Sequence, residues 1–373
     1  MSLERVTLVD IARELGVHRT TVARALNHHP GLPVATRNRI NQKARQMGYT
    51  PDPVLQALTA YRLKKRPPKF HGVIAWLDAY PTRGKASQLF DQERLGAARR
   101  CAELGYRLED FWLHEPGLTP LRLSKILRDR GIQGVLIAPL PDGCDPVRLE
   151  WEWFTVVGIS PTVRDPKVHL VHNAQYESMR EMIQCLHRIG YQRPGMLVIE
   201  EHDRRVRQAW SAGFISQTRN LKLANPNQLI CFETDSAFEE SAFLSWLARF
   251  RPDVLVCNYT DVRPILKNAG WRVPQDLGVV WTLARLIGPE ASGLRQQEVK
   301  IGAAAIDLLT SAILRGERGL PDTQLRVLVS SVFFPGRTIR PHKKNEPSLK
   351  PGSTARHRAG QSSARAAKKQ SPH

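Results

Sequence analysis

The sequence of 373 residues lacks the features that mark membrane, secreted and disulfide-rich proteins. No run of about 18 apolar residues occurs, so we expect no membrane span and no membrane partner. The N-terminus, MSLERVTLVD, has no apolar segment of the kind found in a signal peptide. Five cysteines are scattered without a C-x-x-C pair, which argues against a disulfide framework or a zinc site and favours reduced thiols. Together these absences favour a cytoplasmic protein.

Familiar enzyme signatures are missing as well. We find no G-x-G-x-x-G after an expected strand, no G-x-x-x-x-G-K-[ST] loop, no G-x-S-x-G elbow and no H-E-x-x-H helix. The 12 histidines show no metal-ligand spacing. We therefore expect a protein that is not an enzyme, with no metal and no cofactor.

Positive charge is abundant and unevenly distributed. The formal net charge is +20. Residues 1–66 contain 12 Lys and Arg against 4 Asp and Glu, and residues 341–373 contain 8 against 1, whereas the middle of the chain is close to balance. A charge run is more often a solvated face than a binding site. Two basic ends around a nearly neutral middle nevertheless favour a nucleic-acid-binding segment attached to another domain.

The N-terminal stretch 6–27 contains two short apolar-periodic segments, one on each side of Gly16. Ile11 and Leu15 precede this break, and Val22 and Leu26 follow it. The spacing predicts two helices that each bury one face and are joined by a short turn, which is the helix-turn-helix pattern. The alternative is a solvated helix in an ordinary helical subdomain. The second helix would expose short or cationic side chains able to reach base edges or phosphates: Arg19, Thr20, Ala23 and Arg24.

A third helix over 36–47 and a further helix over 54–62 are expected next. Residues 1–62 resemble the DNA-binding headpiece of the lactose-repressor (LacI) family of bacterial transcription regulators. The motifs V-T-L-x-D-I-A, T-V-x-R-x-L-N, T-R-x-R-I and G-Y-x-P carry the resemblance. It implies a helix-turn-helix DNA-binding headpiece at 1–50, followed by a hinge helix and basic linker at 51–70.

The resemblance also implies which residues contact DNA. Arg19 and Thr20 take the positions that read bases, and Leu58 takes that of a hinge residue that wedges into the minor groove. His18 stands where the family usually has a Ser that caps the recognition helix, so Thr20 or Thr21 would have to supply the acceptor. The full set of expected DNA contacts is Thr7, Arg19, Thr20, Thr21, Arg24, Asn27 and Leu58.

From Gly72 onward, apolar runs alternate with amphipathic segments. Continuous apolar strands that alternate with helices predict parallel sheets covered on both faces, and the repetition of the pattern predicts two lobes. A long helix over 299–314 and a strand over 327–334 would cross back between the lobes. The expected strands are 72–77, 106–113, 134–140 and 154–159 in the first lobe and 195–200, 228–232, 253–258 and 278–283 in the second.

This second part resembles the periplasmic-binding-protein-like core of the same family, for example at Gly190-Tyr191, at Ala212-Gly213-Phe214 and at 273–280. The expected fold class is therefore an all-α helix-turn-helix headpiece plus an α/β two-lobed periplasmic-binding-protein-like (type I) core with parallel sheets. The expected domains are a two-lobed effector-binding and dimerisation domain at 71–340 and a basic disordered tail at 341–373.

In that fold, small molecules bind in the cleft between the lobes, outside the carboxyl ends of the strands. Trp112 and Trp281 could stack on a sugar ring, whereas Trp210 stands where the family often has an Arg that holds ligand oxygens. Arg207, one helical turn earlier, is the expected substitute. For each residue the alternative is a core aromatic or an ordinary loop polar residue. The ligand candidates are Asp78, Tyr80, Trp112, Glu200, Arg207, Trp210, Asn258, Tyr259, Trp281 and Gln296.

The sequence thus predicts a sequence-specific DNA-binding transcription regulator, with a repressor as the leading form, that binds a double-stranded operator as a homodimer or a dimer of dimers. A small molecule in the cleft, such as a sugar, would control binding. Two alternatives stay open. One is a constitutive or architectural DNA-binding protein with a vestigial ligand cleft, and the other is a sugar-binding or sugar-modifying module with an incidental helical N-terminus.

Overall fold

The computed structural model describes residues 6–26, 32–49, 70–223, 230–233, 238–258 and 260–341. The predicted hinge helix, the basic linker and the tail lie outside these residues. So do three of the candidate site residues: Asn27, Leu58 and Tyr259. None of the described helices is both long and apolar enough to span a membrane.

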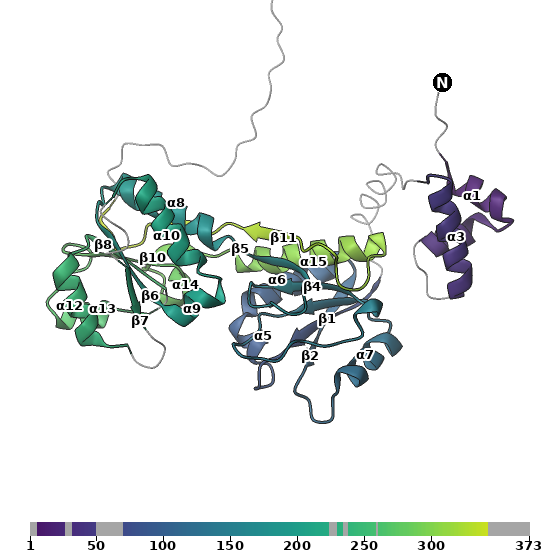
Figure 1. The fold of residues 1–373 in the computed structure, drawn as a ribbon, viewed down its shortest axis with the longest axis horizontal. Coiled ribbons are helices and arrows are strands. Elements are labelled where there is room, and N and C mark those ends of the chain that lie inside the picture. The colour runs from purple at the N-terminus through teal and green to yellow at the C-terminus, as the bar shows by residue number, and fades with distance from the viewer. Residues whose placement is uncertain are drawn as a thin grey trace, which may run out of the picture. The chain divides into compact units, whose positions relative to one another are not determined.

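The N-terminal unit consists of three helices, α1 (Leu8–Leu15), α2 (Arg19–Leu26) and α3 (Val34–Gln46) (Figure 1). Gly16 ends α1 with φ 62°, a left-handed conformation that favours glycine. The helices enclose a small core of buried side chains, which confirms the predicted helix-turn-helix and its 3.6-residue periodicity. The core residues are Ile11, Ala12, Val22, Ala25, Ile40 and Ala44.

The first lobe is built on a six-stranded parallel sheet with strand order β11-β5-β4-β3-β1-β2. In Figure 1, β11 lies beside β5, although about 150 residues separate them in the chain. The strands are β1 (Gly72–Asp78), β2 (Tyr106–Trp112), β3 (Gly134–Ile137), β4 (Thr155–Ile159), β5 (His169–Asn173) and β11 (Arg326–Val329).

Helices cover both faces of this sheet. One face packs against α5 (Lys85–Leu89), α6 (Asp91–Glu103) and α15 (Glu298–Arg315), and the other against α7 (Pro120–Asp129) and the segment around the short 3-10 helix Trp151–Trp153. The helices α6 and α15 touch backbone to backbone. A Cβ on Gly302 would lie 1.8 Å from the carbonyl oxygen of Glu93, so only glycine fits there.

The second lobe has its own six-stranded sheet, ordered β12-β10-β9-β8-β6-β7. Five of its strands are parallel, as predicted, but β12 runs antiparallel to β10 at the edge. The strands are β6 (Pro194–Ile199), β7 (Ile230–Glu233), β8 (Val254–Cys257), β9 (Gly278–Trp281), β10 (Ser292–Arg295) and β12 (Val332–Phe334).

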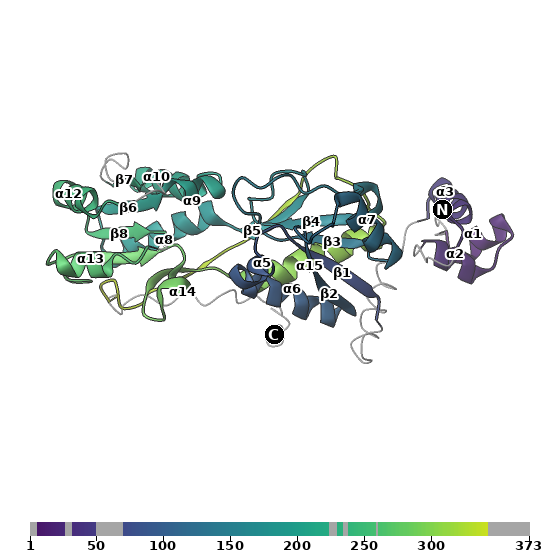
Figure 2. The same cartoon turned by 90° about the horizontal axis from the view of Figure 1, so that it is seen from below.

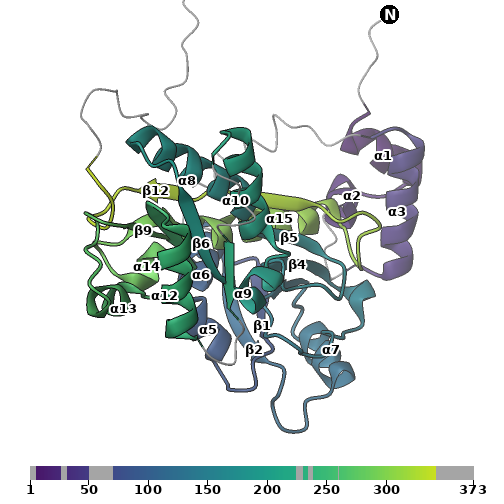
Figure 3. The same ribbon diagram turned by 60° about the vertical axis from the view of Figure 1, so that its left-hand side comes forward.

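The helices of the second lobe also form two layers (Figure 2). On one face, α8 (Gln175–Ile189) and α10 (Ala209–Asn220) pack side by side (Figure 3). On the other face lie α12 (Glu240–Phe250), α13 (Arg263–Asn268) and α14 (Ala284–Ile287). The short α9 (Glu200–Arg205) follows the carboxyl end of β6.

Within the described residues, the chain passes between the lobes three times, at Ala174, at residues 296–297 and at residues 330–331. Two of these crossings are bonded to each other: the Ser331 hydroxyl donates to Asn173 Oδ1 at 2.7 Å, and the Ala174 N–H donates to the Val329 carbonyl at 2.9 Å. The predicted single strand 327–334 is wrong, because Ser330 and Ser331 interrupt it and its halves join different sheets.

Three further expectations need correction. The strands β5 and β10 were not predicted, because His169 and His172 break the apolar run of β5 and Arg295 shortens that of β10. The sequence pattern of residues 206–217 predicts one helix, but α10 starts only at Ala209, after a turn in which Arg207 and Gln208 have φ of 59° and 58°.

Candidate functional site

The outer surface of α2 is the first candidate site. Arg19, Thr20 and Arg24 are exposed on this helix, while Val22 and Ala25 are buried against α1 and α3. Thr21 is half-buried. One helix therefore presents two guanidinium groups and a hydroxyl together, as a helix that enters the major groove requires.

Two cations of the neighbouring helices have carboxylate partners. Lys43 of α3 bonds Glu14 at 2.8 Å, and Arg13 of α1 lies 3.6 Å from Asp10. Within residues 6–26 and 32–49, no ion pair holds Arg19 or Arg24. Their charges are therefore available for phosphates or base edges.

Thr7 has a structural task in addition to its predicted contact with DNA. Its hydroxyl donates to Asp10 Oδ2 at 2.6 Å and accepts from the Asp10 N–H at 3.4 Å, and the same carboxylate accepts from the Thr7 N–H at 2.9 Å. This reciprocal pair is a capping box that satisfies free N–H groups at the start of α1. These hydrogen bonds lower the pKa of Asp10.

The acceptor at the start of α2 comes from His18 itself, in contrast to our expectation that Thr20 or Thr21 would supply it. The Thr20 N–H donates to His18 Nδ1 at 3.4 Å, and the Thr20 hydroxyl lies 2.9 Å from the same nitrogen. A ring nitrogen with a free lone pair can replace the usual side-chain oxygen of a helix cap.

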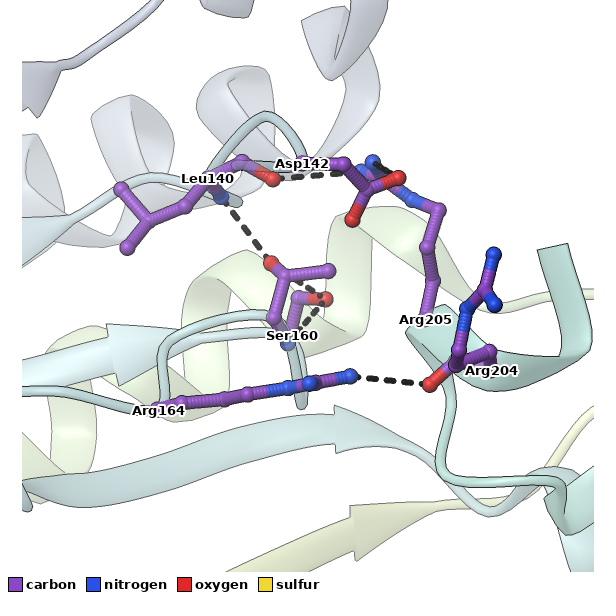
Figure 4. A network of polar contacts seen from close by, with 7 residues as sticks. Leu140, Asp142, Ser160, Arg164, Arg204 and Arg205 are labelled. Atoms are coloured by element: carbon purple, nitrogen blue, oxygen red, sulfur yellow. Dashed lines mark hydrogen bonds and ion pairs between the residues drawn. The ribbon is translucent and has the colours of Figure 1, made fainter. Parts of the chain in front are cut away.

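The second candidate site is the junction where the carboxyl ends of both sheets meet. Arg205 of α9 donates to Asp142 of the first lobe at 2.6 Å and to the Leu140 carbonyl at 3.2 Å (Figure 4). Arg164, which follows β4, donates to the Arg204 carbonyl at 2.9 Å. These contacts hold the lobes together through polar groups that water or a ligand can replace.

Tyr80 joins this junction from the end of β1. Burial raises the pKa of its phenol, while the nearby Arg205 cation and a hydrogen bond from it act in the opposite direction. Sequence reasoning found Tyr80 but missed Arg164, Arg205 and Asp142. Their positions in the loops after β4, β6 and β3 were the available signal, because strand ends of parallel sheets meet at one edge.

Asp78 is buried at the end of β1, and its carboxylate is already occupied. It accepts from the Tyr80 N–H at 2.9 Å and from the Ala86 N–H at 3.3 Å, which fixes the start of α5. Burial raises the pKa of this carboxyl, and the backbone hydrogen bonds partly offset that effect. Its first role is thus to hold the loop that carries Tyr80.

Trp112 and Asp78 line a pocket of about 650 Å³ within the first lobe, next to α7. The Trp112 indole donates to the Tyr80 carbonyl at 2.8 Å, and Arg83 stacks over its ring. Trp112 therefore lines a pocket within the first lobe, whereas the polar contacts between the lobes lie at Arg164 and Arg205.

Two predicted tryptophans are core residues. Trp210 is 4% exposed and packs in the apolar layer between α8, α10 and the second sheet. Trp281 is fully buried on the other face of that sheet and donates to the Thr260 carbonyl at 2.9 Å. Neither ring exposes a face on which a sugar could stack, so both residues are core aromatics, the alternative that the sequence left open.

The other ligand candidates occupy different places. Asn258 is buried at the end of β8, and the Thr282 hydroxyl donates to its carbonyl at 3.3 Å. Glu200 begins α9, and Gln296 lies at a crossing between the lobes. Arg207 lies two residues after the end of α9, and burial together with neighbouring cations lowers its pKa. Among the described residues, no cluster of His, Cys, Asp or Glu could hold a metal.

Two family models match the chain. The family described as bacterial regulatory proteins of the lacI family matches residues 7–52, which include all of α1, α2 and α3. The family described as a periplasmic binding protein-like domain matches residues 183–332, which cover most of the second lobe and the return to the first.

Whole-chain comparisons agree with these matches. The chain is 21% identical over 343 residues to the probable HTH-type transcriptional repressor ExuR of Bacillus subtilis (strain 168), covering 88% of this chain and 96% of that protein. The structure of a CelR transcriptional regulator–cellobiose complex has a TM-score of 0.53 at 18% identity, covering 90% of this chain and all of that one. A LacI-family regulatory protein from Chloroflexus aggregans has a TM-score of 0.55 at 17% identity, over 72% and 98% of the two chains. These structures share the fold.

Proposed function

We propose that this chain, which belongs to the LacI family of bacterial regulatory proteins and joins a DNA-binding to a ligand-binding domain, represses transcription by binding a specific operator. A small molecule held between the lobes would control that binding. The function is binding rather than catalysis. The boundaries 1–50, 51–70, 71–340 and 341–373 remain our predictions for its domains.

The observation that carries the proposal is the surface of α2. Arg19, Thr20 and Arg24 are exposed there, and the arginines are free of ion pairs with the described carboxylates of α1–α3. Arginine can donate two hydrogen bonds to the O6 and N7 atoms of guanine, and threonine can contact several bases. The α1 helix, capped by Thr7, would cross the DNA backbone, as the first helix of such a unit does.

Two copies of the chain would bind together. A helix-turn-helix unit reads only a few base pairs, so a dimer with two units about one helical turn apart is needed for a palindromic site. We propose a homodimer or a dimer of dimers, with Leu58 and Asn27 adding contacts from outside the described residues.

Control by a ligand would act through the lobe junction. Arg205 and Arg164 connect the lobes through exposed or half-buried polar contacts, which a ligand can reinforce or replace. CelR was solved with cellobiose, which supports a carbohydrate or similar small molecule as the effector. Tyr80 and Arg207 are proposed to contact it, because Tyr80 follows the carboxyl end of β1 and Arg207 follows α9, the helix after the carboxyl end of β6.

Selection of binding sites from random DNA, followed by gel-shift titration, tests the proposal. Wild-type protein should return a short palindrome. Arg24→Ala should weaken binding to it by about 1–3 kcal/mol and relax the preference at one base of each half-site. Arg45→Ala is the matched control, because it removes the same charge from an exposed position on α3.

The two variants separate base reading from general attraction to DNA. Arg45→Ala should keep the base preference and at most reduce the salt dependence of affinity. If selection returns no palindrome, or if Arg24→Ala binds the selected site as tightly as wild type, the proposed role of α2 is wrong. Binding without any sequence preference would favour an architectural protein instead.

A further inference from the structure

Arginine side chains are concentrated where the two lobes meet. Arg164 follows β4, Arg204 and Arg207 belong to the segment after β6, and Arg326 begins β11. Figure 4 shows Arg164 of the first lobe reaching the carbonyl oxygen of Arg204 in the second, at 2.9 Å. Both lobes therefore bring positive charge to one place.

Carboxylates balance only part of this charge. Asp142 pairs with Arg205 at 2.6 Å. Within the described ranges, however, no ion pair joins a carboxylate to Arg164, Arg207 or Arg326. The surface arginines elsewhere in the lobes often do have such partners, for example Arg272 with Asp276 at 2.7 Å. Among the described residues, these three junction arginines therefore have no carboxylate partner within ion-pair distance.

These cations lie close enough to act on one another. Burial lowers the pKa of Arg207, and the charges of Arg326 and Arg164 lower it further. Burial likewise lowers the pKa of His172, at the end of β5, and Arg326 and Arg207 add to that effect. Their mutual repulsion disfavours this arrangement of the protein alone, and a bound anion would relieve it.

The backbone around Arg207 adopts an energetically unfavourable conformation. Arg207 and Gln208 both adopt the left-handed conformation, with φ of 59° and 58°, which disfavours residues with a Cβ. The turn is fixed by hydrogen bonds from the Arg207 N–H to the Arg204 carbonyl at 3.1 Å and from the Gln208 N–H to the Asp203 carbonyl at 2.7 Å. Strain of this kind concentrates at functional sites.

We infer that the lobe junction binds a small organic anion, whose carboxylate or phosphate group is held by Arg164 from the first lobe and Arg207 from the second, with Arg326 beside them. The inference rests on the proposed function, because it names the chemical class of the effector. Guanidinium groups hold both kinds of anion through paired N–H donors. An anion held from both lobes binds the closed arrangement more tightly than the open one, so it can shift the equilibrium between them.

Isothermal titration of the full-length protein with matched probes tests this inference. Glucose, glucuronate and glucose 6-phosphate share one ring and differ at carbon 6, and glycerol, glycerate and glycerol phosphate provide an acyclic set. We expect binding of at least one anion and at least tenfold weaker binding of its neutral parent. The responses to carboxylates and to phosphate esters show which of the two groups the junction takes.

Substitution of the junction arginines tests where the anion binds. Arg164→Gln and Arg207→Gln should each weaken the anion at least tenfold, whereas Arg207→Lys, which keeps the charge, should weaken it less. Arg188→Gln, on the exposed last turn of α8, is the control and should bind like wild type. Equal binding of the neutral parent, anion affinity that survives both Gln variants, or binding of none of the anions would each overturn the inference.

The titration contains no DNA, so its result does not depend on whether the protein binds an operator. Gel shifts on the selected operator, with and without the bound anion, test that function separately. Anion binding without discrete operator sites would refute the regulator and leave the anion site intact. Operator binding without any anion binding would refute the anion site and leave the proposed regulator intact.

Discussion

The contact between Arg205 and Asp142 offers the sharpest test of how the lobes are held together. Its Nη1–Oδ2 distance is 2.6 Å, and Arg205 also donates to the Leu140 carbonyl of the first lobe at 3.2 Å. Replacing Arg205 with Gln, Asp142 with Asn, and both together gives a double-mutant cycle that isolates this pair. We expect each single variant to open the lobes more often than wild type.

The size of the effect follows from solvent exposure. The side chains of Arg205 and Asp142 are 23% and 43% exposed, so water screens their attraction. A partly exposed pair contributes about 0.5–1 kcal/mol, which changes the ratio of closed to open lobes by about two- to fivefold. Arg205→Gln should have a larger effect than Asp142→Asn, because it also removes the bond to the Leu140 carbonyl.

Energy transfer between dyes, placed through unnatural amino acids at Lys125 on α7 and Lys267 on α13, would report the closed fraction. Arg272→Gln is the control, because its pair with Asp276 at 2.7 Å lies within the second lobe. High salt should reduce the wild-type closed fraction toward that of the double variant. A coupling energy of zero, or the same opening by Arg272→Gln, would refute the reasoning.

Three further outcomes are expected. Burial raises the pKa of Glu93 from the ordinary carboxyl value of 4.5 to about 7. Between these two pH values the folded protein keeps a proton on Glu93 that the unfolded chain releases. The free energy of unfolding therefore falls as pH rises through this range. Glu93→Gln should remove this loss, about 1–2 kcal/mol, in urea unfolding compared at pH 5.5 and 8. Gly302→Ala should cost roughly 3 kcal/mol or lower the yield of folded protein, because its Cβ would lie 1.8 Å from the Glu93 carbonyl oxygen. Thr7→Ala should destabilise the N-terminal unit by about 1 kcal/mol in thermal melts, whereas Thr7→Ser, which keeps the capping oxygen, should not.

The N-terminal unit could be predicted almost completely from sequence. Ile11, Val22 and Ile40 recur at helical spacing, and all three are buried where that spacing places them. The role of His18 could not be predicted, because helix N-caps are usually small side chains with an oxygen acceptor. Here the ring nitrogen of His18 accepts the hydrogen bond from the Thr20 N–H instead.

The lobes were predictable where strands are continuously apolar and not where polar residues interrupt them. Runs such as β1 and β3 are buried on both faces and read clearly as parallel strands. In β5, His169 and His172 interrupt the apolar run, and His172 lies close enough to Arg207 and Arg326 for their charges to lower its pKa. A strand with polar residues at these positions lacks the continuous apolar run that marks a parallel strand.

The residues of the junction were the least predictable part. Arg205 and Asp142 are 63 positions apart, and their places after β6 and β3 put each at the carboxyl end of its own sheet without indicating that they pair. Their pairing depends on how the two sheets face each other, which strand patterns leave open. The same holds for Trp210 on α10 and for Trp281, the last residue of β9, because both rings are buried in the core of the second lobe.

The two sides of the lobe junction differ in a way that determines how a ligand can act. At the crossings, Asn173 and Ser331 are buried and bonded to each other at 2.7 Å, so this connection is costly to break. At the contact between Arg205 and Asp142, by contrast, the partners are partly exposed, so water can replace either of them and an anion can replace Asp142. Opening should therefore pivot at the crossings and separate the arginine side. An anion that binds there changes the closure equilibrium by its difference in affinity for the two states, and it needs no contact with α2 to change how the chain binds DNA.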